Sequence, residues 1–371
     1  MAGLTWEQVR AWRVARNHLD TRAPRRKLLD VVSGVGAIHA QVQSAAELSL
    51  WARVEDVTPK DIRDALWKRR TLVRTWSVRG TLHLHRASDL PLYAAALSTN
   101  DRWWKGAWLR FVGLSADELE ALLKAIRSAL TDRPATREEL TEKVARKVGP
   151  HVRERMASGW GELLKPAAFR GWLCSGPPRG QNVTFVRPDR WLQAWKEVDG
   201  DRALEEVFRR YLRIFGPATH EDFAAWWGIP PPPARRVRLA LDSELEQVDV
   251  EGTKGWVGPK ELRRMQGVER PSTVRLLPNF DAYVMGFRQR EHMLDKRLYD
   301  RVFRKAGWVS SVVLVDGRIA GVWKHERGSR GIEVGVQRFG RLRAADRKGI
   351  EEEADRLGRF LGKPARVSIT A

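Results

Sequence analysis

The sequence predicts an α+β fold with three tandem winged helix-turn-helix modules and a C-terminal β-rich domain that resembles a small barrel or a curved sheet. Helical segments are followed by short alternating hairpins, and one helix-opening pattern occurs twice. After about residue 271, runs of β-branched residues dominate. At 371 residues the chain exceeds one core. We expect three modules and a terminal domain, over residues 1–95, 96–200, 201–268 and 269–371.

The first module is predicted to contain four helices followed by a hairpin, over residues 5–20, 25–35, 43–53, 59–70 and 71–85. Thr5 is placed to cap the first helix. Pro59 suits the first position of the fourth helix, where its missing N–H costs nothing. In the hairpin, β-branched residues alternate with polar ones on either side of a predicted turn at Arg79-Gly80.

The second and third modules each open a helix with Pro-Ala-Thr, one variable residue, two acids and an apolar residue. Thr136 and Thr219 would cap these helices, and Glu139 and Asp222 lie three residues later, as in a capping box. Hairpin-like segments follow them, over residues 181–186 and 245–257.

The terminal domain is predicted to contain five strands and one long helix, over residues 274–277, 309–315, 318–323, 331–336, 365–369 and 344–361. Asp316-Gly317 between two apolar runs predicts a tight hairpin turn.

The formal net charge of +21, with a pI of about 10.7, favours a polyanionic partner. Nucleic acid is the first choice and an anionic membrane surface the second, while a generally basic surface without a partner is the alternative. No run approaches the ~18 apolar residues of a spanning helix. The single cysteine, Cys174, excludes an internal disulfide, and no Cys/His spacing indicates zinc.

We predict that the segment around Gln41 and Gln43 is the chemical centre of the chain. An amide offers both an acceptor oxygen and two N–H donors, so the pair could hold a water molecule or contact a base edge. Most Gln-x-Gln pairs are solvated surface residues. The small apolar neighbours Ile38, Ala40 and Val42 nevertheless predict a segment buried beside a cleft.

Other polar residues give weaker indications of chemistry. His83 and His85 alternate on a predicted strand and would share one face, which favours a polar face or phosphate contacts over catalysis; without a third ligand they make a poor metal site. Asp281, Arg288 and Arg290 could form a catalytic or DNA-facing group, or an ion-paired loop that seats the terminal domain. No nucleophile elbow or phosphate loop is present.

The chain resembles the AlkZ/YcaQ-type DNA glycosylases, winged-helix proteins that excise bulky or crosslinking N7-alkyl purines. Five segments carry the resemblance in the family's order, at residues 40–43, 79–84, 216–228, 277–283 and 315–323. The resemblance implies that Gln41 and Gln43 are catalytic. An aspartate at the second position marks the YcaQ-like branch, so Gln43 places the chain nearer the AlkZ-like branch.

The resemblance implies a monofunctional DNA glycosylase that hydrolyses the N-glycosidic bond of cationic N7-alkylated purines, in bulky adducts or interstrand crosslinks. Such a base is already a good leaving group, which suits a pair without a carboxylate. The alternative is a non-catalytic winged-helix DNA-binding protein or regulator. A nuclease is a weaker option, because no acidic metal cluster is legible.

We therefore expect a monomer that binds double-stranded DNA with alkylated purines, in the cytoplasm and associated with the nucleoid. It would need no cofactor or metal and would not bind a membrane. The predicted DNA-binding residues are Arg74, Arg79, His83, His85, Arg288 and Arg290.

Overall fold

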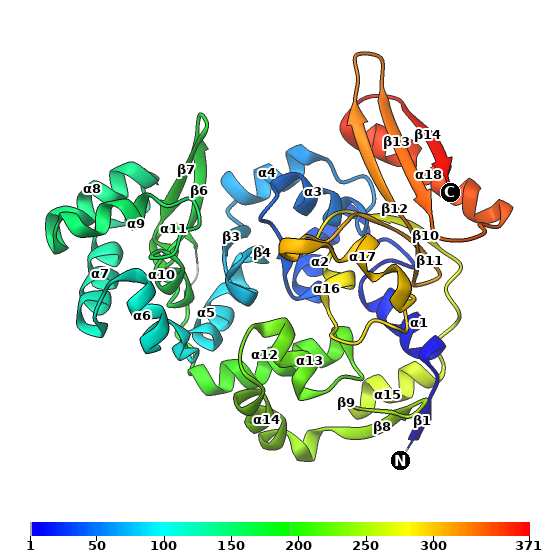
Figure 1. Ribbon diagram of the computed structural model, residues 1–371, viewed down its shortest axis with the longest axis horizontal. Coiled ribbons are helices and arrows are strands. Elements are labelled where there is room, and N and C mark those ends of the chain that lie inside the picture. Colours follow the sequence, from blue (N-terminus) through cyan, green and yellow to red (C-terminus); the bar gives the residue numbers. More distant parts are fainter. Residues whose placement is uncertain (1, 194) are drawn as a thin grey trace. The chain divides into compact units, whose positions relative to one another are not determined.

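The computed structural model describes residues 2–193 and 195–371 and is an α+β protein, as predicted (Figure 1). The chain forms two compact units, one from Met1–Ile62 with Phe208–Ala371 and the other from Arg63–Val207. The first unit is thus assembled from both ends of the chain. Across the described residues, no helix is both long and apolar enough to cross a bilayer.

The helices predicted for the first seventy residues are present, with one short strand, β2 (Ile38–His39), between the second and the third. They are α1 (Trp6–Arg16), α2 (Leu28–Val35), α3 (Gln43–Trp51) and α4 (Pro59–Trp67). Thr5 and Gln8 form a capping box at the start of α1. The helix ends four residues earlier than predicted, because the Asn17 side chain donates to the Arg13 carbonyl and His18 adopts a positive φ of 53°.

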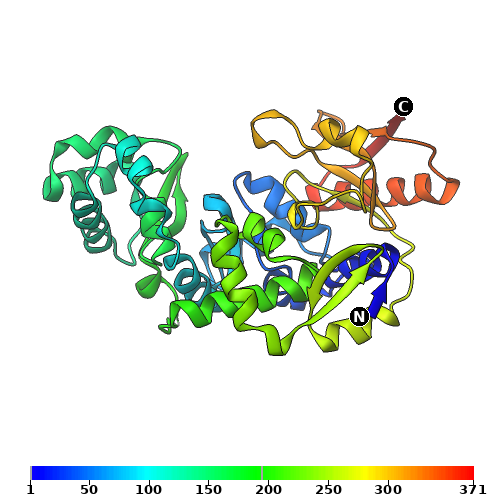
Figure 2. The ribbon, with the colours of Figure 1, turned by 60° about the horizontal axis from the view of Figure 1, so that its bottom comes forward.

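The chain between residues 200 and 266 forms four helices and one hairpin, and two of these elements pack with the N-terminus. The elements are α12 (Gly200–Phe215), α13 (His220–Trp227), α14 (Pro231–Ala240), β8 (Glu246–Val250), β9 (Thr253–Val257) and α15 (Pro259–Gln266). Thr219 and Asp222 form the predicted capping box. An unpredicted strand, β1 (Ala2–Leu4), runs parallel to β8 (Figure 2). Core side chains from α1, the hairpin and α15 join beneath this sheet.

The C-terminal domain is a five-stranded sheet covered by one helix. Its strands follow the order β10 (Val274–Leu277), β11 (Val312–Val315), β12 (Arg318–Arg327), β13 (Ile332–Arg338) and β14 (Ala365–Thr370). Only the β13–β14 pair is parallel. Asp316 and Gly317 both have positive φ, 49° and 79°, as a primed hairpin turn requires.

The helix of this domain, α18 (Ala344–Leu361), has the predicted bounds and contacts both β10 and β14. Two short helices, α16 (Ala282–Met285) and α17 (Tyr299–Val302), lie between β10 and β11 in the sequence. In the strand order of the described residues, β10 and β14 are edges, so the sheet is open and the barrel expectation is wrong. Pairing around a closed ring would need these two strands to bond, whereas the chain places α18 against both.

The second unit contains two hairpins and a set of helices. Its strands are β3 (Leu72–Trp76), β4 (Leu82–Arg86), β5 (Ala135–Thr136), β6 (Cys174–Arg179) and β7 (Asn182–Val186). Its helices are α5 (Leu90–Ser98), α6 (Gly106–Val112), α7 (Ala116–Ala129), α8 (Arg137–Val148), α9 (Arg153–Ala157), α10 (Lys165–Phe169) and α11 (Pro188–Trp191). The predicted hairpin over residues 71–85 is the antiparallel pair β3–β4, and Arg79 and Gly80 turn the chain with positive φ. The segment predicted over residues 181–186 forms only β7, which pairs with the unpredicted strand β6. Thr136 and Glu139 form the predicted capping box.

Candidate active site at the start of helix α3

The two glutamines lie where an extended buried segment turns into α3. Ile38 and Ala40 before them are fully buried, as is Ala46 after them. Gln41 itself is exposed and Gln43 is half-buried. The prediction of a buried segment is therefore confirmed for the flanking residues and is wrong for Gln41. Its side chain is exposed, while apolar residues on both sides of it are buried.

The first turn of α3 begins without a side-chain cap. Val42 occupies the N-cap position with φ −105° and ψ 111°, and its carbonyl accepts from the Ala46 N–H. An aliphatic N-cap cannot accept from the N–H groups of the first turn, so that turn keeps the partial positive charge of a helix N-terminus. Gln43 is the first residue of this turn.

Gln43 contacts a carboxylate one turn along the helix, at Glu47. The Gln43 Nε2 atom donates to Glu47 Oε1 at 3.4 Å, a long hydrogen bond. Because an ionised carboxylate only accepts, this contact orients the amide: Nε2 faces Glu47 and Oε1 faces away from it. The expected site without a carboxylate thus has one beside it. The i,i+4 spacing of Gln43 and Glu47 is the sequence feature that could have identified this contact.

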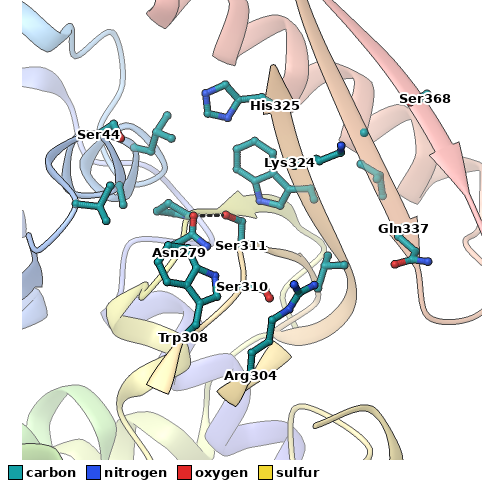
Figure 3. Close-up of a pocket in the computed structure, with 18 of the residues that line it drawn as sticks. Ser44, Asn279, Arg304, Trp308, Ser310, Ser311, Lys324, His325, Gln337 and Ser368 are labelled. Atoms are coloured by element: carbon teal, nitrogen blue, oxygen red, sulfur yellow. Dashed lines mark hydrogen bonds between the residues drawn. The ribbon is translucent and has the colours of Figure 1, made fainter. Parts of the chain in front are cut away.

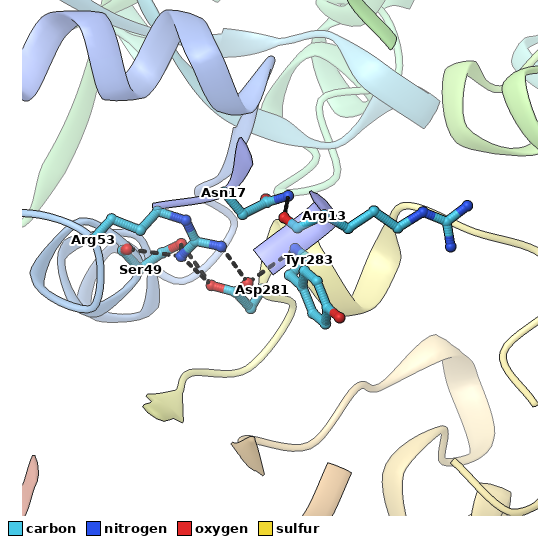
Figure 4. Close-up of polar contacts among 6 residues, drawn as sticks. All are labelled: Arg13, Asn17, Ser49, Arg53, Asp281 and Tyr283. Carbon is cyan, nitrogen blue, oxygen red and sulfur yellow. Dashed lines mark hydrogen bonds and ion pairs between the residues drawn. The ribbon is translucent and has the colours of Figure 1, made fainter. Parts of the chain in front are cut away.

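The other end of α3 is held by a buried ion pair. Arg53 Nη2 and Nη1 donate to Asp281 Oδ1 and Oδ2 at 2.7 and 2.8 Å, and both side chains are 0% exposed (Figure 4). The Ser49 hydroxyl donates to Asp281 Oδ2 at 2.8 Å, and the Tyr283 N–H donates to Oδ1 at 3.0 Å. Of the two interpretations left open for Asp281, the structural ion pair is confirmed.

A row of rings connects the glutamine segment with the loop before β11. His39 stacks on Phe280 with ring centroids 4.6 Å apart, and Phe280 meets the Trp308 ring edge-on at 5.0 Å. Phe280 has a φ of 59°, a conformation that costs a bulky residue roughly 1–3 kcal/mol and persists only when its surroundings fix it. Its neighbour Asp281, locked on Arg53, supplies that constraint.

A cavity of about 640 Å³ opens beside the start of α3 (Figure 3). Val42 and Ser44 line one side of it. The opposite sides come from the loop before β11 and from β12 and β13, among them Trp308, Trp323 and His325. Burial, together with the nearby Arg327 charge, lowers the pKa of His325, which favours a neutral ring.

The predicted DNA-binding residues of the β3–β4 hairpin are largely buried. His83 and His85 are 2% and 1% exposed, and their ring centroids lie 6.3 Å apart, which confirms that they share one face. The Ser77 hydroxyl is hydrogen-bonded to His85 Nε2 at 2.9 Å. Arg74 and Arg79 are half-buried, and burial lowers the pKa of Arg74. Such burial leaves the two histidines little surface for a phosphate, so their predicted role stays a prediction.

Arg288 and Arg290 lie close in sequence but differ in their surroundings. The Arg288 side chain is exposed, and its backbone N–H donates to Asp222. The Arg290 guanidinium is half-buried over the Phe303 ring, 3.9 Å from its centroid. Arg288 is thus the better placed of the two to reach a phosphate. Within residues 2–193 and 195–371, no three His, Cys, Asp or Glu side chains are grouped so that they could hold a metal ion.

Comparisons with known proteins agree along nearly the whole chain. A family model described as DNA glycosylase AlkZ-like matches residues 32–360, which include both glutamines and Asp281. The interstrand DNA cross-link repair glycosylase of Streptomyces sahachiroi is 34% identical over 369 residues, covering 96% of this chain and 97% of that protein. The solved structure of the Streptomyces sahachiroi DNA glycosylase AlkZ superposes with a TM-score of 0.89 at 33% identity, covering 99% of this chain and 100% of that one.

Proposed function

Because this chain belongs to the AlkZ-like DNA glycosylase family, we propose that it hydrolyses the N-glycosidic bond of cationic N7-alkylated purines in double-stranded DNA, in bulky adducts or interstrand crosslinks. The relationship predicted from the five sequence segments is confirmed, and the chain is a DNA glycosylase. Family membership argues against the alternative of a non-catalytic DNA-binding protein. The observation that carries the proposal is the position of Gln41 and Gln43, exposed and half-buried at the start of α3, with the Glu47 carboxylate beside Gln43.

In the proposed reaction the protein needs to position the substrate and a water molecule but does not need to protonate the leaving base. Alkylation at N7 gives the purine a positive charge, so the C1′–N9 bond breaks with its electron pair moving to the base, which leaves neutral without a general acid. A water molecule then forms the new bond to C1′ and loses a proton to solvent. Acceptor oxygens held beside C1′ stabilise the oxocarbenium-like transition state and the water together.

The contact with Glu47 supports this assignment for Gln43. With Nε2 engaged by the carboxylate at 3.4 Å, the Gln43 Oε1 atom is the group left to accept from water. The carboxylate also places a negative charge one helical turn from Gln43, which favours the positive charge that develops on the sugar. Glu47 acts through Gln43 and is a positioning residue in this proposal.

We further propose that the three helix–hairpin modules function as winged helices that contact DNA phosphates, in a monomer associated with the nucleoid. The +21 charge of the chain supports electrostatic binding of this kind. Arg288 is the most exposed of the predicted contacts, and Arg74, Arg79 and Arg290 are the half-buried ones. His83 and His85 would support the β3–β4 hairpin and reach DNA only if it moved.

The test is release of N7-methylguanine from a duplex by Gln41→Ala and Gln43→Ala under single-turnover conditions. Each substitution removes one oriented acceptor, so we expect release to fall by on the order of 10²-fold while binding of the duplex is retained. Gln266→Ala, which truncates an exposed glutamine at the end of α15, is the matched control and should keep the wild-type rate.

Unchanged release by both variants would exclude the proposed mechanism. Loss of binding and release together would instead assign the glutamines to DNA contact. A melting curve for each variant separates either result from misfolding.

A further inference from the structure

The cavity beside α3 is larger than a purine needs. Its volume of about 640 Å³ falls within the ~300–1,000 Å³ typical of sites that hold drug-sized ligands. Val42 and Ser44 contribute to its wall, whereas Gln41 and Gln43 are not among the described residues that line it. The cavity and the proposed reaction centre thus share one short segment but use alternate residues of it.

The walls of the cavity are aromatic and fixed in place. The Trp323 indole N–H donates to the Leu277 carbonyl at 2.8 Å, and His325 stacks on the Trp323 ring at 5.7 Å. Trp308 is 44% exposed and rests edge-on against Phe280. A large apolar ring that a fold supports from behind and leaves open in front is suited to stack on a ligand.

Several polar groups of the cavity form hydrogen bonds or ion pairs within the protein. Ser311 donates to Asn279 Oδ1 at 3.0 Å (Figure 3). Asn279 Nδ2 donates to the Val309 carbonyl at 3.0 Å. Lys324 is engaged by Glu326 at 2.7 Å. The interior therefore favours a flat apolar group over a ligand that must form many hydrogen bonds.

We propose that this cavity binds the planar aromatic part of the group attached to N7, the part of the lesion that is neither base nor sugar. The assignment rests on the proposed function, because it places the scissile bond at Gln41 and Gln43. A substituent on N7 points away from the sugar, so a lesion with C1′ at the glutamines can extend into a neighbouring cavity. Stacking on Trp308 then selects bulky aromatic adducts over small alkyl groups.

The experiment compares two duplexes that differ only in the lesion, N7-methylguanine or an N7-guanine adduct that carries an anthracenylmethyl group. We expect Trp308→Ala to lower kcat/KM for the aromatic adduct about tenfold, the scale of one aromatic contact, and to leave N7-methylguanine within about twofold of wild type. Trp308→Phe keeps a ring and should retain most activity on both. Trp160→Ala, at an indole that is 75% exposed in the second unit, is the matched control.

A second measurement does not depend on catalysis. Free 9-anthracenemethanol should bind the wild-type protein and quench its tryptophan fluorescence, and Trp308→Ala should weaken this binding about tenfold. Equal binding by the two proteins would overturn the proposal, as would equal loss on both DNA substrates, which would indicate that the cavity receives the purine itself. If the wild-type protein released neither base, the proposed function would fail, and the quenching experiment would still decide what the cavity binds.

Discussion

The two ends of helix α3 differ in exposure and in how their polar side chains are paired. At its start, Gln41 is exposed, Gln43 is half-buried, and Val42 gives the first turn no side-chain cap. At its end, Arg53 and Asp281 form a bidentate ion pair with both side chains fully buried. The first end is accessible to an incoming molecule, whereas the second is buried and held by an ion pair.

The residues that stabilise α3 and the residues proposed to act on the substrate therefore lie at opposite ends of the helix. A buried pair joined by two hydrogen bonds holds the helix in one position, and removal of one partner leaves the other charge buried and unpaired. The accessible end carries the polar side chains of Gln41 and Gln43. The backbone of these side chains is fixed by the helix, while the side chains remain accessible to a substrate. A binding or catalytic site requires both.

The largest expected effect is at the buried end of α3. Asp281→Ala strands the Arg53 charge, and we expect a loss of about 3–5 kcal/mol in the free energy of unfolding measured by urea titration. Glu326→Ala, which breaks the exposed pair with Lys324, is the control and should leave stability near wild type. A loss from Asp281→Ala no larger than that of the control would mean that the two ends of α3 do not differ as described.

At the start of α3 we expect an effect of intermediate size, on the rate of base release and not on stability. Glu47→Ala frees the Gln43 amide to rotate, and we expect kcat for base release to fall roughly tenfold with KM unchanged, on the scale of one hydrogen bond to a charged group. Glu47→Gln keeps an acceptor oxygen and should recover most of the rate. The unfolding free energy of both should stay near wild type, and a parallel fall in stability would indicate a structural role for Glu47 instead.

The smallest effect is expected from Ser49→Ala. Its hydroxyl donates to Asp281 and accepts from Arg53, while the ion pair itself survives the substitution. We expect a loss of about 1 kcal/mol in unfolding free energy and an unchanged rate of base release. A slower release without a loss of stability would show that the buried end of α3 influences the reaction directly.

Local features of the fold were predictable because neighbouring residues determine them. Thr5, Thr136 and Thr219 each accept from the backbone three residues on, and a capping box is legible in four residues of sequence. The Asp316-Gly317 turn is equally local, since both positions need positive φ. The helix α18 has the bounds predicted for it, Ala344–Leu361.

Features that depend on distant partners were not predictable. Arg53 and Asp281 are 228 positions apart, and neither residue signals the other in the sequence. Strand β1 has three residues, too few for a periodicity, and forms only because β8 offers it an edge. At the site, the sequence singles out Gln41 and Gln43 and the family resemblance implies their role. The ring contacts of His39 with Phe280 and of Phe280 with Trp308 join segments too distant in sequence to be predicted.

The assembly of the first unit from both ends of the chain has a consequence for biosynthesis. The ribosome releases residues 1–62 first, yet their partners in the same unit, residues 208–371, emerge only after the whole second unit has been made. Residues 63–207 are contiguous and can fold as they leave the exit tunnel. The glutamine segment, with its apolar flanks, must therefore remain without its partners from residues 208–371 while the second unit is made, so we expect this segment to need protection by chaperones during translation.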